Sequence, residues 1–151
     1  RLLLPSIRIS FMILPPELTE AYQKKAEFYN QTASKAEQIA LCQFIRDGHL
    51  ASQTRRLKRL YSVKMKQLLT AIREVFDKSC QIQIGSAGTS LALTVTCGCE
   101  GNVLKKKARA KGLRLEILEE KPGTVTLLLS CSAMPSEDFL PACRLLKSLL
   151  D

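Results

Sequence analysis

The side chains that could do chemistry are six cysteines, one histidine and a concentration of basic residues. The cysteines are Cys42, Cys80, Cys97, Cys99, Cys131 and Cys143. Structural zinc sites usually combine four Cys or His ligands in pairs two to four residues apart. Cys97 and Cys99 are too close for a Cys-x-x-Cys pair, and there is a single histidine, so we predict no metal site. The cysteines also lack the dense spacing of a secreted disulfide scaffold, which predicts reduced and mostly buried thiols in a cytoplasmic protein.

His49 has two interpretations. It follows Gly48 and precedes a long helical pattern. A histidine can act as an acid or base near neutral pH. That role needs a carboxylate and a nucleophile nearby, and the sequence shows neither beside His49. We therefore interpret it as a helix-start residue that makes local backbone bonds.

The formal net charge is +9 at pH 7, and much of the excess lies between Arg46 and Lys66. Such a charge can indicate a nucleic-acid-binding protein. The residues that would carry this role are Arg55, Arg56, Lys58 and Arg59. No aromatic residues interleave with them to stack bases, so the sequence favours a solvated basic helix face.

Residues 49–78 contain no Gly and no Pro, and their apolar residues recur at the spacing of one helical face. At ~1.5 Å per residue, an unbroken helix of this length would extend about 45 Å. A helix this long typically connects two packed bodies. We therefore predict an interdomain helix that positions the elements on either side of it.

The segment before the long helix predicts one strand and two shorter helices. Residues 7–14 are β-rich, and a helix follows from Pro16 to about residue 30. Ser34 and Glu37 have the spacing of a capping box, and Gly48 suits a left-handed helix end. The lone strand has no partner nearby in the sequence, so we expect its sheet to lie outside this chain, and we expect an isolated chain to self-associate through it.

After residue 78 the apolar period changes from 3.6 to 2. Residues 80–86 and 90–96 alternate like strands, and a basic helix ending near Gly112 follows. Residues 113–120 and 124–132 predict two more strands, and a last amphipathic helix starts near residue 135. The run Leu127 to Leu129 predicts burial on both sheet faces. The predicted fold class is α+β: a long helix followed by a small αβ sandwich of about four mainly antiparallel strands under two helices.

Length and composition are those of a globular domain. The chain has 151 residues, of which 46% are hydrophobic and 25% charged. No apolar run reaches membrane-spanning length, and the apolar start lacks a signal-peptide cleavage site. The absence of an initiator Met and the abrupt apolar start lead us to expect a piece of a longer protein.

Several short motifs, taken in order, resemble one family. They are Pro5-Ser6-Ile7-Arg8-Ile9-Ser10, Leu14-Pro15-Pro16-Glu17-Leu18, Glu37-Gln38-Ile39-Ala40-Leu41, Phe44-Ile45-Arg46-Asp47-Gly48-His49 and Arg55-Arg56-Leu57 with Tyr61. This order resembles the C-terminal part of a fold-type I aminotransferase, and most closely the MocR branch of GntR-type transcriptional regulators. The resemblance is specific over residues 1–76 and is one of pattern over the rest.

The resemblance implies a domain division and a set of partners. Residues 1–14 would be a remnant strand of a large domain that binds pyridoxal phosphate, residues 15–79 a helical connector, and residues 80–151 the small C-terminal αβ domain. The parent protein would be a cytoplasmic homodimer with no membrane association. It would bind DNA only through an N-terminal winged-helix domain that this chain lacks.

The resemblance also implies specific site residues. Arg8 falls on the motif arginine that holds the cofactor phosphate, a role that suits a planar and permanently charged guanidinium. Arg1 falls on the position of the lysine that binds the cofactor aldehyde, and arginine does not form this Schiff base. Leu127 to Leu129 fall where catalytic relatives carry an arginine for the substrate carboxylate. We therefore assign no catalytic residue, and pyridoxal phosphate is expected in the parent rather than in this chain alone.

Three functions remain open from the sequence. The first is a fragment of a MocR-like regulator that contributes to the effector and cofactor cleft and to dimerisation, without catalysis of its own. The second is a trimmed fragment of a genuine class I/II aminotransferase. The third is a free-standing basic module that binds nucleic acid, which we rank last because a solvated helix face explains the charges.

Overall fold

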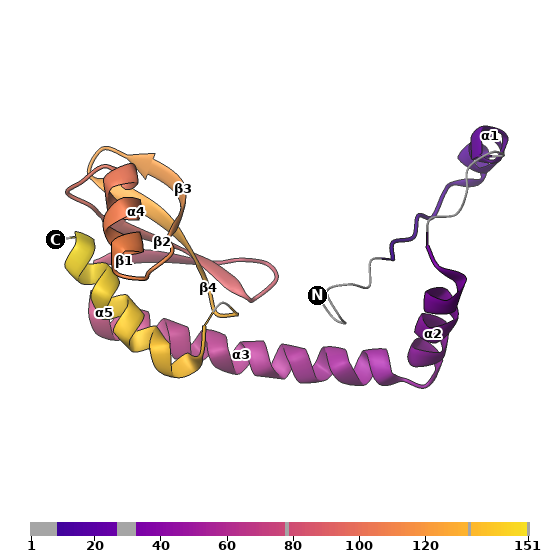
Figure 1. The fold of residues 1–151 in the computed structure, drawn as a ribbon, viewed down its shortest axis with the longest axis horizontal. Coiled ribbons are helices and arrows are strands. Elements are labelled where there is room, and N and C mark those ends of the chain that lie inside the picture. Colours follow the sequence, from indigo (N-terminus) through magenta and orange to yellow (C-terminus); the bar gives the residue numbers. More distant parts are fainter. Residues whose placement is uncertain (1–8, 27–32, 78, 133, 151) are drawn as a thin grey trace. The chain divides into compact units, whose positions relative to one another are not determined.

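The structure, a computed structural model, describes residues 9–26, 33–77, 79–132 and 134–150. Its helices and strands follow one another along the chain as drawn in Figure 1. They are α1 (Pro16–Ala26), α2 (Lys35–Arg46), α3 (His49–Phe76), β1 (Cys80–Ile84), β2 (Ser90–Thr96), α4 (Gly101–Ala110), β3 (Glu116–Lys121), β4 (Thr124–Ser130), the 3-10 turn η1 (Ser136–Asp138) and α5 (Phe139–Leu150). The chain divides into two compact units, residues 1–57 and residues 58–151.

The first unit has no core of its own among its described helices. Neither α1 nor α2 contains a buried side chain. Four of their large apolar residues, Leu18, Tyr22, Ile39 and Ile45, are 49–60% exposed. Amphipathic helices gain most of their stability by packing an apolar face, so these faces are suited to contact a surface.

Residues 9–14 form no strand, which differs from the prediction for residues 7–14. Phe11 is 88% exposed and Ile13 84% exposed. A β-rich segment becomes a strand only when its backbone groups pair with a neighbour, and the four described strands pair only with one another. Arg8 and the rest of residues 1–8 lie outside the described residues.

The start of α2 corrects a second prediction. Ser34 has the extended backbone of an N-cap, but its side chain makes no capping hydrogen bond. The predicted capping box with Glu37 is therefore not formed, and the helix begins with the Gln38 N–H donating to the Ser34 carbonyl at 3.0 Å. The left-handed end at Gly48 is confirmed by its φ of 75°.

Helix α3 is continuous over 28 residues. It ends at Phe76, and Asp77 follows with a φ of 48°. Its buried side chains all lie in its second half, at Met65, Leu68, Ala71, Ile72 and Phe76. The residues of the predicted basic face, Arg55, Arg56, Lys58 and Arg59, are exposed, as a solvated helix face requires.

The second unit contains one four-stranded antiparallel sheet in the order β1-β2-β4-β3. Its two hairpins turn through glycines with positive φ, Gly88 at 66° and Gly123 at 76°. β2 and β4 pair along their whole length, from Ser90 with Ser130 to Thr96 with Thr124. The predicted fold of four antiparallel strands after a long helix is confirmed. β3 begins at Glu116, three residues later than predicted, and carries a register shift between Ile117 and Glu119.

The core lies between one sheet face and the helices α3, α4 and α5 (Figure 1). Its fully buried side chains are Ile72, Leu91, Leu93, Leu104, Val125, Leu127, Cys131 and Phe139. The edge of this core is held by polar contacts from α3. The Lys64 ammonium donates to the Met134 carbonyl at 2.9 Å, and Glu74 pairs with Arg144 at 3.0 Å.

Cys143 lies in this core on α5 and is 4% exposed. Burial raises the pKa of its thiol from 9.0 to about 11. The unfolded chain therefore releases this proton at a lower pH than the folded chain does. The sign follows from proton linkage: the free energy of unfolding falls as the pH rises from about 9 to about 11, by roughly 2–3 kcal/mol for two pH units.

We predict that Cys143→Ala removes this component of the pH dependence. Urea denaturation followed by circular dichroism at pH values from about 8 to 11 measures the free energy of unfolding across the titration. The wild-type chain should lose about 2–3 kcal/mol more than the variant over this range. Cys42→Ala, at an exposed cysteine, is the matched control and should keep the wild-type slope. Equal slopes for Cys143→Ala and wild type would contradict the prediction.

Candidate functional site

The second unit leaves one sheet face without a covering helix among its described residues. A row of paired residues crosses all four strands on this face: Gln83 with Ala92, Ala92 with Leu128, and Leu128 with Glu116. Side chains alternate between the two faces of a strand, so this row lies opposite the core residues of the same strands. Ala92 and Leu128 are half-buried, whereas Gln83 and Glu116 at the edges are exposed.

A second row on this face is polar. Thr94 of β2 faces Thr126 of β4, and their hydroxyls lie 2.9 Å apart. Gln81 and Glu119 flank this pair on the outer strands. The face therefore combines small, polar and aliphatic side chains, which suits the wall of a cleft more than a hydrophobic core.

The structure decides which of Leu127, Leu128 and Leu129 belongs to this face. Leu127 is fully buried opposite Leu93, and Leu129 pairs with the buried Leu91. Only Leu128 lies on the uncovered face. The prediction that the run is buried on both faces is therefore wrong, because the helices of this unit pack against one face alone.

Leu128 stands where the resemblance to catalytic aminotransferases would place a substrate-binding arginine. The resemblance implies a substrate-binding arginine in this run, and Leu128 is the position whose side chain lies on the uncovered face. None of the four strands contains an arginine. An aliphatic side chain offers neither charge nor hydrogen-bond donor to a carboxylate.

The other predicted site residues are not brought together. Arg1 and Arg8 lie outside the described residues, so their assigned roles stay predictions. His49 is exposed, and its ring centroid lies 5.4 Å from that of Phe44. The local backbone bond expected of His49 stays a prediction.

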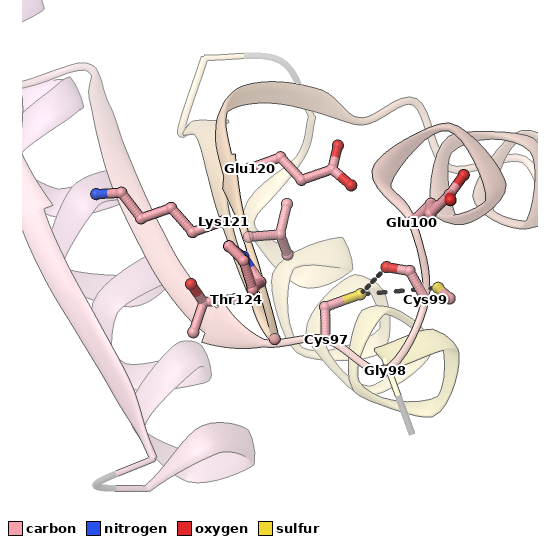
Figure 2. A pocket seen from close by; sticks show the side chains of 10 residues that line it. Cys97, Gly98, Cys99, Glu100, Glu120, Lys121 and Thr124 are labelled. Carbon is pink, nitrogen blue, oxygen red and sulfur yellow. Dashed lines mark hydrogen bonds between the residues drawn. The ribbon is translucent and has the colours of Figure 1, made fainter.

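A contact between two cysteines was not predicted from the sequence. The Sγ atoms of Cys97 and Cys99 lie 3.7 Å apart in the loop between β2 and α4 (Figure 2). Both residues line an open hollow of about 360 Å³ together with Glu120 and Lys121. Residues two apart at a strand end lie on one side of the chain, and this spacing was the available signal.

Next to this hollow, Glu120 holds the start of α4. The Gly101 N–H donates to its Oε1 at 2.8 Å. A carboxylate at this position satisfies an otherwise unpaired amide and complements the positive end of the helix dipole. A Cβ at residue 101 would lie 2.5 Å from the Glu120 Oε2 and 2.7 Å from the Ile117 Cδ1, so a larger residue there would require these two side chains to shift.

A second hollow, of about 510 Å³, is basic, and its lining can be compared with the groups that pyridoxal phosphate needs. Lys105, Arg109 and Arg114 line it together with Gly112, Leu113 and Leu115. These cations could attract a phosphate, but the lining has no aromatic ring to stack on a pyridine and no carboxylate to face its nitrogen. This hollow therefore does not fit pyridoxal phosphate.

The described part of the chain contains neither a metal-ligand cluster nor a membrane-spanning helix. No group of three or more His, Cys, Asp or Glu residues there could hold a metal ion. None of the described helices is both long and apolar enough to cross a membrane.

Comparison with solved structures defines the class of fold. The structure matches LysN, the α-aminoadipate aminotransferase of Thermus thermophilus, with a TM-score of 0.65 and 17% identity over 91% of this chain and 36% of that chain. It matches the kynurenine aminotransferase of Pyrococcus horikoshii with a TM-score of 0.69 and 13% identity over 89% of this chain and 34% of that chain. The chain therefore has the fold of the C-terminal domain of fold-type I aminotransferases.

The sequence relatives are transcriptional regulators. The chain is 31% identical over 151 residues to the HTH-type transcriptional regulator YhdI of Bacillus subtilis (strain 168), covering 97% of this chain and 32% of the relative. It is 29% identical over 119 residues to the rhizopine catabolism regulatory protein MocR of Rhizobium meliloti, covering 79% of this chain and 24% of the relative. No protein-family model matches the chain. The resemblance to MocR-like regulators is confirmed, and the chain spans about a third or less of the length of these relatives.

We predict that Leu128→Arg is tolerated and that Leu127→Arg, one residue earlier, is not. The new guanidinium at residue 128 would lie on the uncovered face beside Glu116, so the free energy of unfolding should change by no more than about 1 kcal/mol. At residue 127 the charge would be buried without a partner, at a cost of several kcal/mol or roughly the whole stability of the domain. Urea denaturation of both variants measures the difference, and equal destabilisation would show that this face is covered.

Proposed function

We propose that this chain is the small C-terminal domain and interdomain helix of a cytoplasmic MocR-like transcriptional regulator. In that protein it closes over a cleft containing pyridoxal phosphate, shapes the effector pocket and contributes to a homodimer. DNA is bound by a winged-helix domain elsewhere in the regulator. The chain is not catalytic alone.

The observation that carries this proposal is the match of 97% of the chain to an HTH-type regulator. The chain corresponds to 32% of that relative, so the regulator would supply a much larger body for it to contact. The exposed apolar residues of α1 and α2 supply surfaces for such a contact. From the aminotransferase fold, we expect the large domain of the same regulator to pack against these apolar residues.

Leu128 favours sensing over transamination. A transaminase must hold the substrate carboxylate while the amino group reacts, and an arginine does this well because its donors form a rigid fork. Leu128 leaves this part of the cleft wall aliphatic. An effector could still bind there, but through other contacts than a carboxylate pair on this strand.

The cofactor role of this chain rests on Arg8. When bound, pyridoxal phosphate would supply an aldehyde that captures amino compounds. The Arg8 guanidinium would neutralise and orient its phosphate. Arg1 cannot supply the aldehyde-binding amine, so that group would come from another residue or be absent. The LysN structure holds a phosphopyridoxyl-leucine, which is a property of that protein.

The long helix would transmit the effector signal. The second half of α3 contributes buried side chains to the core of the second unit, and its first residues belong to the first unit, with no break in the helix between them. A rigid helix shared by two bodies can convert closure of one into movement of the other. Effector binding would in this way change the geometry of the DNA-binding domains.

A working aminotransferase is the second candidate, and the fold similarity to LysN and the kynurenine enzyme favours it. A lysine at position 1 in the parent and no winged helix before it would support this alternative. A nucleic-acid-binding role for the chain itself would instead give a steep salt dependence of DNA binding by the 151-residue chain.

We predict that the regulator containing this chain binds its operator with an affinity that an amino-compound effector changes. A coupling free energy of about 1–3 kcal/mol would shift the operator Kd by roughly 5- to 150-fold. Fluorescence anisotropy with labelled operator DNA, with and without a panel of amino acids and amines, measures this shift. Conversion of an amino donor to its keto acid, with no effect on operator binding, would favour the aminotransferase and overturn the proposal.

We also predict that Arg8→Ala weakens binding of pyridoxal phosphate to the parent protein. Loss of a charge-assisted hydrogen bond of about 1.5–3 kcal/mol corresponds to a roughly 10- to 150-fold rise in Kd. Absorbance titration with the cofactor measures this change. Arg8→Lys should lose less, and Arg46→Ala, at an exposed arginine of α2, should bind like wild type. An unchanged Kd for Arg8→Ala would remove Arg8 from the phosphate site.

A further inference from the structure

The loop between β2 and α4 holds two thiols in direct contact. Cys97 and Cys99 are separated by Gly98, and their Sγ atoms are 3.7 Å apart. The Cys97 Sγ–H also donates to the Cys99 carbonyl at 3.1 Å. Figure 2 shows the Cys97 sulfur facing Cys99 across the turn at Gly98, with both residues among those that line the hollow. Among the described cysteines, this is the one pair whose sulfur atoms are in contact.

Cys97 is anchored to the sheet, and the glycine that follows it leaves the loop free to move. The Cys97 N–H donates to the Gly123 carbonyl at 3.1 Å, directly after the last pair of β2 and β4. Gly98 is exposed, and a Cβ placed on it would meet nothing within 4 Å. A disulfide needs an S–S distance of about 2.05 Å, so the sulfurs must approach by roughly 1.7 Å. The bare backbone of Gly98 gives the loop the freedom for this movement.

The hollow gives a reagent access to the pair. Cys97 is 7% exposed, and Cys99 is half-buried, so an incoming molecule reaches Cys99 first. The opening also includes Gly98, Glu100, Pro122 and Gly123, which leave room for a small molecule. By contrast, Cys131 and Cys143 are buried, and Cys42 lies on α2, in the other unit.

We propose that Cys97 and Cys99 form a redox site, a dithiol that a low-molecular-weight disulfide such as oxidised glutathione converts to an intraloop disulfide. The Cys99 thiolate attacks one sulfur of the reagent and releases one glutathione thiolate. The Cys97 sulfur, its proton passing to that thiolate, then attacks the Cys99 sulfur and releases the second glutathione. The balance is two protein thiols and one disulfide reagent giving one protein disulfide and two glutathione thiols.

The surroundings favour a reversible site over a permanent crosslink. Burial raises the pKa of the Cys97 thiol, and the nearby Glu120 charge raises it further. Cys97 is therefore mainly a protonated thiol near neutral pH, and it must pass its proton to the released glutathione thiolate before it can attack. The ring closed by neighbours two residues apart is small, and strained disulfides are reduced more readily than relaxed ones.

Closure of this disulfide would act on α4. Cys99 lies two residues before Gly101, whose N–H donates to the Glu120 Oε1 at 2.8 Å. Movement of Cys99 towards Cys97 would therefore pull on the start of the helix. The redox chemistry does not depend on the proposed function, because it requires only residues of the second unit.

The test uses the 151-residue chain with Cys80→Ser, so that the tryptic peptide of residues 79–105 contains only the two loop cysteines. The chain is incubated with oxidised glutathione in native buffer, alkylated with iodoacetamide in denaturant and analysed by mass spectrometry. We expect this peptide to lose two hydrogens and both alkylation sites, and dithiothreitol to restore both.

Single variants separate the two steps. Cys97→Ser should retain a glutathione adduct on Cys99, because the resolving thiol is absent. Cys131→Ser, at a buried cysteine away from the loop, is the matched control and should form the loop disulfide like the parent chain. A peptide of residues 79–105 that remains fully alkylated, or that keeps glutathione on Cys99 while Cys97 is present, would overturn the proposal. Because the first measurement needs no loop variant, it remains decisive if Cys97→Ser fails to fold.

Discussion

Burial of one sheet face against three helices is the interaction on which the second unit depends. Leu93 and Leu127 of the central strands, Ile72 of α3 and Leu104 of α4 have no exposed surface. Each such side chain contributes roughly 1.5–3 kcal/mol when removed from water. Because the helices cover only this face, burial alternates along β2 and along the first half of β4, and the opposite face carries threonines, serines, alanine and Leu128. The core thus determines which residues can serve a site.

The two units use their apolar residues in different ways. In the second unit they form a core, whereas in α1 and α2 none of them is buried. A helix with an apolar face and no cover is stabilised when a partner supplies one. The exposed side chains of the first unit and the uncovered sheet face of the second are therefore the surfaces that the described part of the chain leaves without cover. This division fits a chain that corresponds to about a third of its regulator relative.

Strong periodic patterns predicted the fold correctly, whereas isolated local signals were right at Gly48 and wrong at Ser34. The long helix and the four antiparallel strands follow from apolar spacing sustained over many residues. The capping box at Ser34 failed because a serine cap competes with other ways to start a helix. The face of Leu128 could not be read from three leucines in a row, since only the packed helices decide which face is covered. The spacing of Cys97 and Cys99 is visible in the sequence, but the contact of their sulfur atoms depends on the loop geometry around Gly98, which that spacing does not determine.

The order of the strands has a consequence for how this unit is made. β2 pairs with β4, so α4 and β3 must be synthesised between the two partners. The Lys64 contact with Met134 joins residues 70 positions apart, and α5 supplies Phe139 and Leu146 to the core only after every strand has formed. On the ribosome, the apolar side of α3 therefore emerges long before its cover. Non-local pairing of this kind slows folding and exposes apolar surface of the unfinished chain, so α3 keeps an uncovered apolar side until β4 and α5 have been synthesised.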